Sequence, residues 1–550
     1  MAHGRRGTRA LVGAIAAFCA LAPALRAEEH AHSHDLTELG VVHFPTSCRN
    51  VDAELTRAVA LLHSFGYEES RRAFDAVTAA DPSCAIAYWG IAMTWWHPIW
   101  SPPNAKELAA GSAAAQRATE LPAGSDRERG YIEAIAVFYR DADRLGHEQR
   151  ARAYSTAMAA LANRLPDDHE ARIFYALSLL GSAPANDATF ANQKKAADIL
   201  NGLLPVEPRH PGIAHYMIHS FDYPELASDA LPAARAYSKI APDSPHALHM
   251  PSHIFTRLGL WQDSIASNLA SADAARRLVA VRHPGASSMD ALHALDYLEY
   301  AYLQIGDEGQ ARAVLDEAIS AKTFDSRSFQ AGYALAAIPA RFALERRDWK
   351  GATQLEPPQS DLPWTSFAYA PAITYFAQAL GAARTGELDR AGAALARLEV
   401  IRAELEKSPV PGPYDWTRQV ESIRLAAKAW LVHAAGNRSE ALKLAQSAAD
   451  LEEATGKHPV TPGTPLPARE LYGDMLIENE RPAEALAAYE ASLREAPNRF
   501  NSLYGAARAA ELAKDTQRAR TVYAALLAQC VAGSSRPELT HAREFIGGAQ

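Results

Sequence analysis

A spacing of 34 residues recurs along this chain and constrains its fold more than any other feature. Near the C-terminal end, Ala485 and Tyr489 are followed 34 residues later by Ala519 and Tyr523. A short repeat cannot bury its apolar face alone, so neighbouring copies have to stack and the array grows in one dimension. The 550 residues therefore predict a repeat array in place of three or four globular domains. Less regular copies surround Trp261, Gly306, Gly386 and Gly436.

The first copy carries the most complete set of repeat residues. These are Tyr67, Ser70, Phe74, Val77 and Pro82. They correspond to positions 17, 20, 24, 27 and 32 of the tetratricopeptide repeat, which the sequence resembles, with Ser70 and Val77 as mild departures. The resemblance covers most of residues 48 to 530. It implies an all-α fold, an α-solenoid of tetratricopeptide-type helix-turn-helix repeats, without a β-sheet domain.

The N-terminal residues carry a targeting pattern. Residues 1–27 combine early arginines with an apolar run and small residues suited to cleavage after Ala24 or Ala27. This pattern predicts a signal peptide and hence an exported protein, periplasmic or secreted. Residues 28–47, which contain several histidines, are expected to be disordered.

The remaining chain divides at a proline-containing seam. We expect an N-terminal tetratricopeptide-like solenoid over 48–355, with a histidine-rich concave face, and C-terminal tetratricopeptide-like repeats over 365–550. A second proline-rich stretch, from Pro459 to Pro467, is expected to be an extended loop between repeats because such proline density cannot remain helical.

Composition and motifs exclude several function classes. The chain carries 55 basic and 64 acidic residues, a formal net charge of −9, so nucleic acid is not an expected partner. After the signal segment no run of about 18 apolar residues is present, so no membrane span is expected. The sequence also lacks nucleophile-elbow, H-E-x-x-H, phosphate-loop and dinucleotide-binding motifs. Whether the protein is an enzyme stays open, and the histidines are the only candidates for catalytic residues.

Three cysteines follow the signal segment. Cys48 and Cys84 bracket the first repeat, and Cys530 lies near the end of the chain. In an oxidising compartment, one pair and one remaining thiol is the simplest arrangement. We therefore predict a disulfide between Cys48 and Cys84.

Three sets of polar residues define the main candidate site. Each set follows a spacing of i, i+3 or i+4, and i+7, which places its members on one face of a helix. The sets are His215, His219 and Asp222; His246, His249 and His253; and His293, Asp296 and Tyr300.

The resemblance gives these sets a common direction. In the repeat register they fall at positions 2, 5, 9 and 12 of successive first helices, which face the concave, ligand-binding surface in the family. First helices pack about 8 to 10 Å apart. The four histidines at positions 5 and 9 of two adjacent helices are therefore expected to converge within about 5 Å of one point. They are His215, His219, His249 and His253, with His246 and His293 bordering the point one turn away.

The chemistry of these residues leaves three functions open. The histidines suit a copper or zinc ion, with Asp222, Asp296 and Tyr300 as direct ligands or as acceptors and donors that orient the imidazoles. The first interpretation is an exported metal-binding repeat protein. The second is a non-enzymatic scaffold for a protein or peptide in the concave groove. The third is a metal-dependent oxidase or hydrolase that uses the same histidines. Six histidines also match the ligand count of a coupled dicopper centre.

Overall fold

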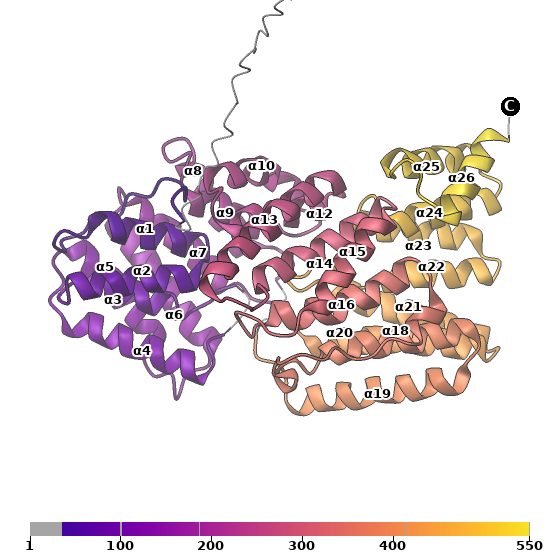
Figure 1. Ribbon diagram of the computed structural model, residues 1–550, viewed down its shortest axis with the longest axis horizontal. Helices are drawn as coiled ribbons and strands as arrows, with labels where there is room; N and C mark the ends of the chain where they lie inside the picture. The colour runs from indigo at the N-terminus through magenta and orange to yellow at the C-terminus, as the bar shows by residue number, and fades with distance from the viewer. Residues whose placement is uncertain (1–35, 100–101, 186, 413, 549–550) are drawn as a thin grey trace, which may run out of the picture. The chain divides into compact units, whose positions relative to one another are not determined.

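The computed structural model describes residues 36–548 except 100–101, 186 and 413. Within these residues the chain is all-α, and the β contact is an isolated bridge between Ser287 and Phe324. Residues from Leu36 onward form one compact unit, in which each helix packs on its neighbours along the chain (Figure 1). The predicted all-α fold is confirmed. The proposed signal segment, 1–27, lies outside the described residues.

The first half of the chain supplies most of the helices around the candidate site. They are α1 (Asp52–His63), α2 (Tyr67–Ala80), α3 (Ala85–Met93), α4 (Ala105–Glu120), α5 (Asp126–Tyr139), α6 (His147–Arg164), α7 (His169–Gly181), α8 (Ala191–Leu203), α9 (Pro211–Phe221), the 3-10 helix η1 (Ala227–Ala230), α10 (Leu231–Ile240), α11 (Pro245–His249), α12 (Pro251–Arg257), α13 (Trp261–Arg282), α14 (Met289–Gln304) and α15 (Glu308–Ser320).

The second half continues the same stacking. Its helices are α16 (Phe329–Glu345), α17 (Trp349–Ala352), the 3-10 helix η2 (Trp364–Phe367), α18 (Ala370–Thr385), α19 (Leu388–Lys407), α20 (Trp416–Ala434), α21 (Arg438–Thr455), α22 (Ala468–Glu478), α23 (Pro482–Glu495), α24 (Phe500–Leu512), α25 (Thr516–Gln529) and α26 (Pro537–Gly547). Among these described helices, none combines the length and apolar character needed to cross a membrane.

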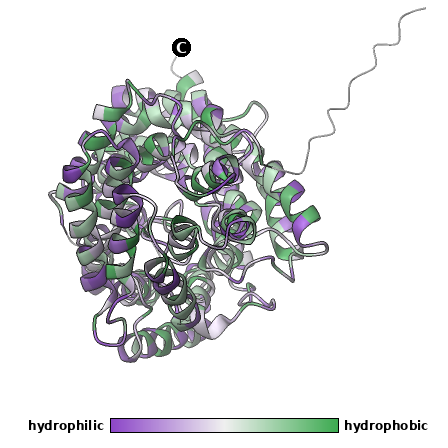
Figure 2. Cartoon of the chain, turned by 90° about the vertical axis from the view of Figure 1, so that its left-hand side faces the viewer, coloured by the Kyte–Doolittle hydropathy of each residue, from purple (hydrophilic) through white to green (hydrophobic). Residues whose placement is uncertain are grey.

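Large and small residues fit together between helices, as the repeat pattern requires. Helix α2 buries Ser70, Phe74 and Val77 on one face, which is the apolar stripe of an amphipathic helix. The Phe74 ring packs on Gly90 of α3 so closely that a Cβ atom there would lie 2.2 Å from it. In Figure 2, hydrophobic and hydrophilic residues alternate along the helices, in keeping with one buried face each. This stacking of helix pairs is a tetratricopeptide-like solenoid.

The segment before α1 is ordered by apolar anchors. Leu39 and Phe44 are buried, and Phe44 stacks on Trp89 with ring centroids 5.4 Å apart. The backbone N–H of Val41 donates to the carbonyl of Arg209. The expectation that 28–47 is disordered is therefore wrong for residues 36–47, because their apolar side chains pack on the first repeats.

The proposed seam near residue 360 is not a break in packing. The chain has no helix between α17 and η2, but α16 packs on α18 across this loop. One hydrophobic cluster continues from Trp261 to Met475. The division into 48–355 and 365–550 therefore does not separate two cores.

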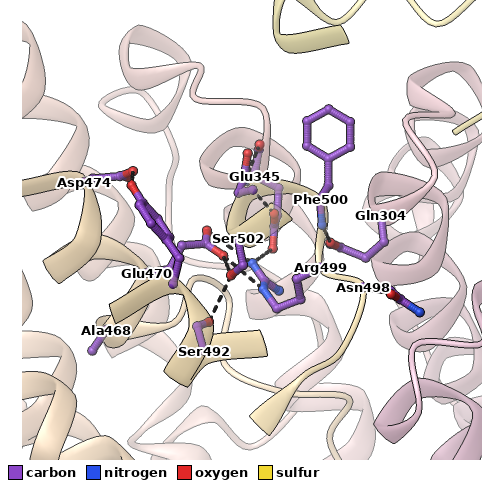
Figure 3. Close-up of polar contacts among 12 residues, drawn as sticks. Gln304, Glu345, Ala468, Glu470, Asp474, Ser492, Asn498, Arg499, Phe500 and Ser502 are labelled. Atoms are coloured by element: carbon purple, nitrogen blue, oxygen red, sulfur yellow. Dashed lines mark hydrogen bonds and ion pairs between the residues drawn. The ribbon is translucent and has the colours of Figure 1, made fainter. Parts of the chain in front are cut away.

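The C-terminal repeats pack back on the middle of the chain. Trp261 donates its indole N–H to the carbonyl of Asn498 at 2.9 Å, and the N–H of Val531 donates to Ile305. Gly259 has a φ of +64°, and a Cβ there would lie 2.2 Å from the carbonyl oxygen of Pro497, so the close approach requires glycine. Figure 3 shows buried Arg499 between Glu345 and Glu470 beside this contact.

Cys48 and Cys84 form a disulfide, the pair expected from the sequence. Their Cα atoms are 5.2 Å apart, and the bridge closes a loop of 36 residues between the segment before α1 and the start of α3.

We expect the variant with both cysteines replaced by Ser to lose about 3 to 4 kcal/mol of unfolding free energy, because its unfolded chain is less constrained. Urea denaturation followed by circular dichroism measures this loss. Cys530→Ser, outside the bridge, is the control, and equal stability of all three proteins would contradict the prediction.

Candidate metal centre

Four helices from three successive hairpins position the candidate histidines. Pro211 occupies the first turn of α9, where its missing N–H costs no helical hydrogen bond. Pro251 separates α11 from α12 directly after Met250, so this helix is interrupted between its histidines. The six residues are His215 and His219 on α9, His246 and His249 on α11, His253 on α12 and His293 on α14.

The structure divides these residues into two groups of three. In the first group, His215 Nε2 lies 3.0 Å from His219 Nε2 and 3.1 Å from His246 Nε2. In the second, His249 Nε2 lies 3.1 Å from His253 Nε2, and the His293 ring centroid is 4.2 Å from that of His249. Within each group the ligand atoms all lie within 4.8 Å of one another. Three nitrogens each about 2 Å from one ion need separations of this order.

The expected grouping of the histidines is therefore wrong. One four-histidine point was expected, but His246 joins the α9 pair and His293 joins the α11 and α12 residues. His246, one turn before His249 on α11, reaches the α9 pair, whereas His249 and His253 reach His293 of α14. His215, His249 and His253 are almost fully buried.

The proton positions in the second group follow from its hydrogen bonds. Asn268 donates from Nδ2 to the carbonyl of Ser264 at 2.8 Å, so its Oδ1 is the acceptor that lies 2.7 Å from His249 Nδ1. The carboxylate of Asp222 lies 2.9 Å from His253 Nδ1. Both imidazoles therefore carry their proton on Nδ1, and their Nε2 lone pairs face each other at 3.1 Å. Two lone pairs at this distance repel each other, and a cation between them would remove the repulsion.

The first group has the same feature at its central residue. His215 Nδ1 donates to the backbone carbonyl of His63 at 2.6 Å, which leaves Nε2 with its lone pair. This lone pair faces the Nε2 atoms of both His219 and His246. The Phe65 ring covers the group, with its centroid 4.3 Å from that of His215. The backbone of Phe65 has a φ of +52°, a conformation shared by the turn residues of other helix pairs, such as Gly259 and Lys514.

A proton is poorly suited to be the cation between these nitrogens. Burial lowers the pKa of all six imidazoles, and in most of them a neighbouring histidine lowers it further. The pKa of His249 falls to about 3. At neutral pH the groups are therefore uncharged imidazoles, the form that binds a transition metal.

A third cluster of titratable groups consists of His63, Glu170 and His210, whose hydrogen bonds are satisfied by protein groups. His210 accepts the N–H of Gly212 at Nδ1, so its Nε2–H donates to Glu170. His63 donates from Nε2 to the same carboxylate and accepts the hydroxyl proton of Tyr216 at Nδ1. Although burial opposes it, the two histidines lower the pKa of Glu170, which stays ionised. Every nitrogen here has a partner of the correct kind, so this cluster needs no metal. Its role is to hold the carbonyl of His63 that orients His215.

Of the three predicted orienting residues, only Asp222 lies at the site. Burial raises its pKa, but Lys457 and Arg257 lower it well below the usual range, and the ionised group accepts from His253. Asp296 pairs with Arg341, and Tyr300 accepts from Arg499, so both assignments are wrong. On α14 the next turn after His293 presents Tyr297, one position later than the predicted i+3 spacing.

Three further residues contribute to the site, and of these Lys457 and Asn268 were not predicted from the sequence. Tyr297 has its ring centroid 4.9 Å from those of both His249 and His253. Lys457, from the proline-rich loop, donates to Asp222 at 3.0 Å. Asn268 lies on α13, outside the first helices of the repeats. For Tyr297 the i+4 spacing from His293 was a usable signal, whereas nothing in the sequence links residues 222 and 457.

The two groups border a cavity of about 700 Å³. His219 and His246 of the first group and His253 and His293 of the second contribute to its wall. A volume of this order is typical of small-molecule sites. The rest of the wall includes aromatic side chains from distant repeats, namely Tyr67, Trp95, Phe329, Phe367, Tyr369, Tyr414 and Trp416.

Two further histidines make the stability of the metal-free protein depend on pH. Burial lowers the pKa of His97 to about 4 and that of His458 to about 3. Their contribution is complete above pH 6.5 and is lost as the pH falls toward these values, because only the unfolded chain then takes up protons. We expect a loss of about 1.4 kcal/mol per pH unit for each residue within this window. Urea denaturation between pH 7.5 and 4.5 measures the slope. His97→Phe/His458→Phe should flatten it, and an unchanged slope would contradict the assignment.

Comparisons with known proteins add limited information. No protein-family model and no curated protein sequence matches this chain. Among solved structures it is similar to yeast Tom70, at 11% identity over 90% of this chain and 96% of that one, with a TM-score of 0.33. It is also similar to a monomeric mutant of IFIT1 with Gppp-AAAA, at 13% identity over 92% and 96% of the two chains, with a TM-score of 0.35. The P58(IPK) TPR domain matches at 14% identity over 70% and 99%, with a TM-score of 0.21. Since every score is below 0.5, the proposals below depend only on the residues of this chain.

Proposed function

We propose that this protein binds two transition-metal ions, copper or zinc, one in each three-histidine group. The observation that carries the proposal is the pair of Nε2 lone pairs of His249 and His253, which face each other at 3.1 Å with their protons fixed on Nδ1. A metal ion between them converts a repulsion into two ligand bonds. Imidazole is a good ligand for both metals.

Each ion would keep an open position. Three histidine ligands leave one place free in a four-coordinate ion, as in catalytic zinc sites. Because both groups border the same cavity, a ligand there reaches this open position. The arrangement suits reactivity better than storage or a purely structural role. We also propose that the protein works outside the cytoplasm, which the Cys48–Cys84 disulfide supports.

Metal analysis of the full chain, purified without a histidine tag, tests the proposal. After loading with copper or zinc and removal of free ions, we expect two equivalents per chain by inductively coupled plasma mass spectrometry. His253→Ala and His215→Ala should each lose one equivalent, from the second and first group respectively. His541→Ala is the matched control, since His541 is half-buried on α26, where it pairs with Glu511 and belongs to neither three-histidine group.

The outcomes separate the proposal from its main alternative. Binding that is unchanged in both site variants, or no binding by the unaltered chain, would overturn it. A non-enzymatic scaffold that docks a protein or peptide beside the cavity would then be the better interpretation. Circular dichroism of each variant checks that the helices are retained.

A further inference from the structure

We infer that the two ions are copper, and that together with dioxygen they oxidise a phenolic ligand bound in the aromatic-walled cavity. The inference rests on the proposed metal site and specifies its metal, its co-reactant and its substrate class. Three observations support it: the charge of the ligand set, the closeness of the two groups, and the character of the cavity wall.

The ligand set favours a metal of low charge. Neither three-histidine group of the described residues includes a carboxylate, so six neutral imidazoles bring no negative charge to the ions. The orienting carboxylate of Asp222 already pairs with two cationic side chains, Arg257 and Lys457, so it does not offset the charge of a bound ion. Isolated charge is costly to hold in a buried site. In the reduced state of the reaction, two copper(I) ions place half as much charge there as two zinc(II) ions, and zinc has no such state. Magnesium and manganese prefer oxygen ligands, and non-haem iron sites commonly include a carboxylate.

The two groups are close enough to act together. The rings of His219 and His253 have centroids 6.3 Å apart, and those of His246 and His249 are 6.4 Å apart. These pairs join the first group to the second. Since members of both groups also border one cavity, a molecule as small as dioxygen can contact both ions. Two ions that each exchange one electron can then perform a two-electron step.

The cavity wall suits an aromatic ligand. Trp95, Phe329 and Tyr414 line the cavity and are only partly buried, so part of each aromatic side chain is accessible. Such faces bind a planar ring by offset or edge contacts. Asp290 and Asp325 also border the cavity, and their carboxyl oxygens can accept hydrogen bonds from hydroxyl groups. A phenol offers both a ring and a hydroxyl group, and it is readily oxidised.

The reaction balances for a 1,2-diphenol. Two O–H bonds of the diphenol break, and it becomes a quinone with loss of two protons and two electrons, which reduce two copper(II) ions to copper(I). Two turnovers supply four electrons and four protons. Dioxygen takes them up, its O–O bond breaks and two molecules of water form. Dioxygen is the oxidant, and no further reductant is required.

Oxygen consumption by the copper-loaded full chain tests the inference. With 4-methylcatechol as probe, we expect one dioxygen consumed for every two quinones formed, measured with an oxygen electrode and by quinone absorbance. The zinc-loaded protein and the copper-treated His253→Ala variant should not exceed the rate of an equal amount of free copper. Copper-loaded His541→Ala should match the unaltered protein.

A variant of the cavity wall distinguishes weaker substrate binding from loss of metal. Phe329→Leu should retain two copper ions but raise the KM for 4-methylcatechol several-fold, because it removes a partly buried ring of the cavity wall that packs on His458 and belongs to neither three-histidine group. Two bound copper ions without catechol-dependent oxygen uptake would overturn this inference and leave the metal site standing. Absence of bound metal would overturn both. Ester hydrolysis by the zinc-loaded protein, without oxygen uptake by the copper form, would identify a hydrolase instead.

Discussion

Adding copper(II) or zinc(II) to the metal-free protein should raise its free energy of unfolding by about 4 kcal/mol per ion. This value applies when the free ion is about a thousand times more concentrated than its dissociation constant, and it is the largest effect that we predict. The physical reason is that the ion binds the folded histidine groups far better than the unfolded chain. In the metal-free state the facing lone pairs of His249 and His253 repel, and the ion removes this repulsion.

Urea denaturation at increasing metal concentration, followed by circular dichroism, measures the gain. His253→Ala should retain only the gain from the first group, and His215→Ala only that from the second. His541→Ala should behave as the unaltered chain does, because its side chain is on α26. A midpoint that does not move with either metal would contradict the prediction, and so would equal gains in all four proteins.

Replacing Arg499 by Ala should destabilise the protein by about 3 to 5 kcal/mol, the loss typical of a broken buried ion pair. Arg499 donates to Glu345 at 2.6 Å, to Glu470 at 3.1 Å and to the hydroxyl of Tyr300 at 2.7 Å. All of these side chains are buried. Figure 3 shows Arg499 beside Glu345 and Glu470. Without the guanidinium group, two carboxylates remain in the interior with no cation between them.

The pH dependence of this variant provides a second measurement. Burial raises the pKa of Glu470 even in the presence of Arg499, and removal of the cation should raise it further. A carboxyl group with a raised pKa in the folded state favours folding as it becomes protonated. The stability deficit of Arg499→Ala should therefore shrink as the pH falls from 7.5 toward 5.

A surface arginine is the matched control for this prediction. Arg518 pairs with Glu490, and both side chains are substantially exposed. Arg518→Ala should cost no more than about 1 kcal/mol, because water screens exposed pairs. Equal losses in Arg499→Ala and Arg518→Ala would show that the buried network does not hold the C-terminal repeats against α14 and α16.

The all-α repeat architecture could be predicted from the sequence, because each repeat packs mainly on the repeats next to it in the chain. The spacing of Tyr489 and Tyr523 and the pairing of Phe74 with a glycine reflect contacts between neighbours in the chain. For the same reason the i, i+4 and i, i+7 spacings identified all six histidines. The Cys48–Cys84 pair could be proposed because few cysteines compete. The proline-rich loop could be placed because proline excludes a helix.

The division of the six histidines into two groups, and most of the residues that orient them, could not be predicted from the sequence and depend on the tertiary structure. Which histidines group together depends on the offset between helices and on the interruption at Pro251, and the sequence spacing alone does not fix either. Asp296 and Tyr300 follow the predicted spacing, yet Arg341 and Arg499 from other helices engage them. Lys457 reaches Asp222 across 235 positions. Such contacts arise when the solenoid folds back on itself, and no local pattern in the chain encodes them.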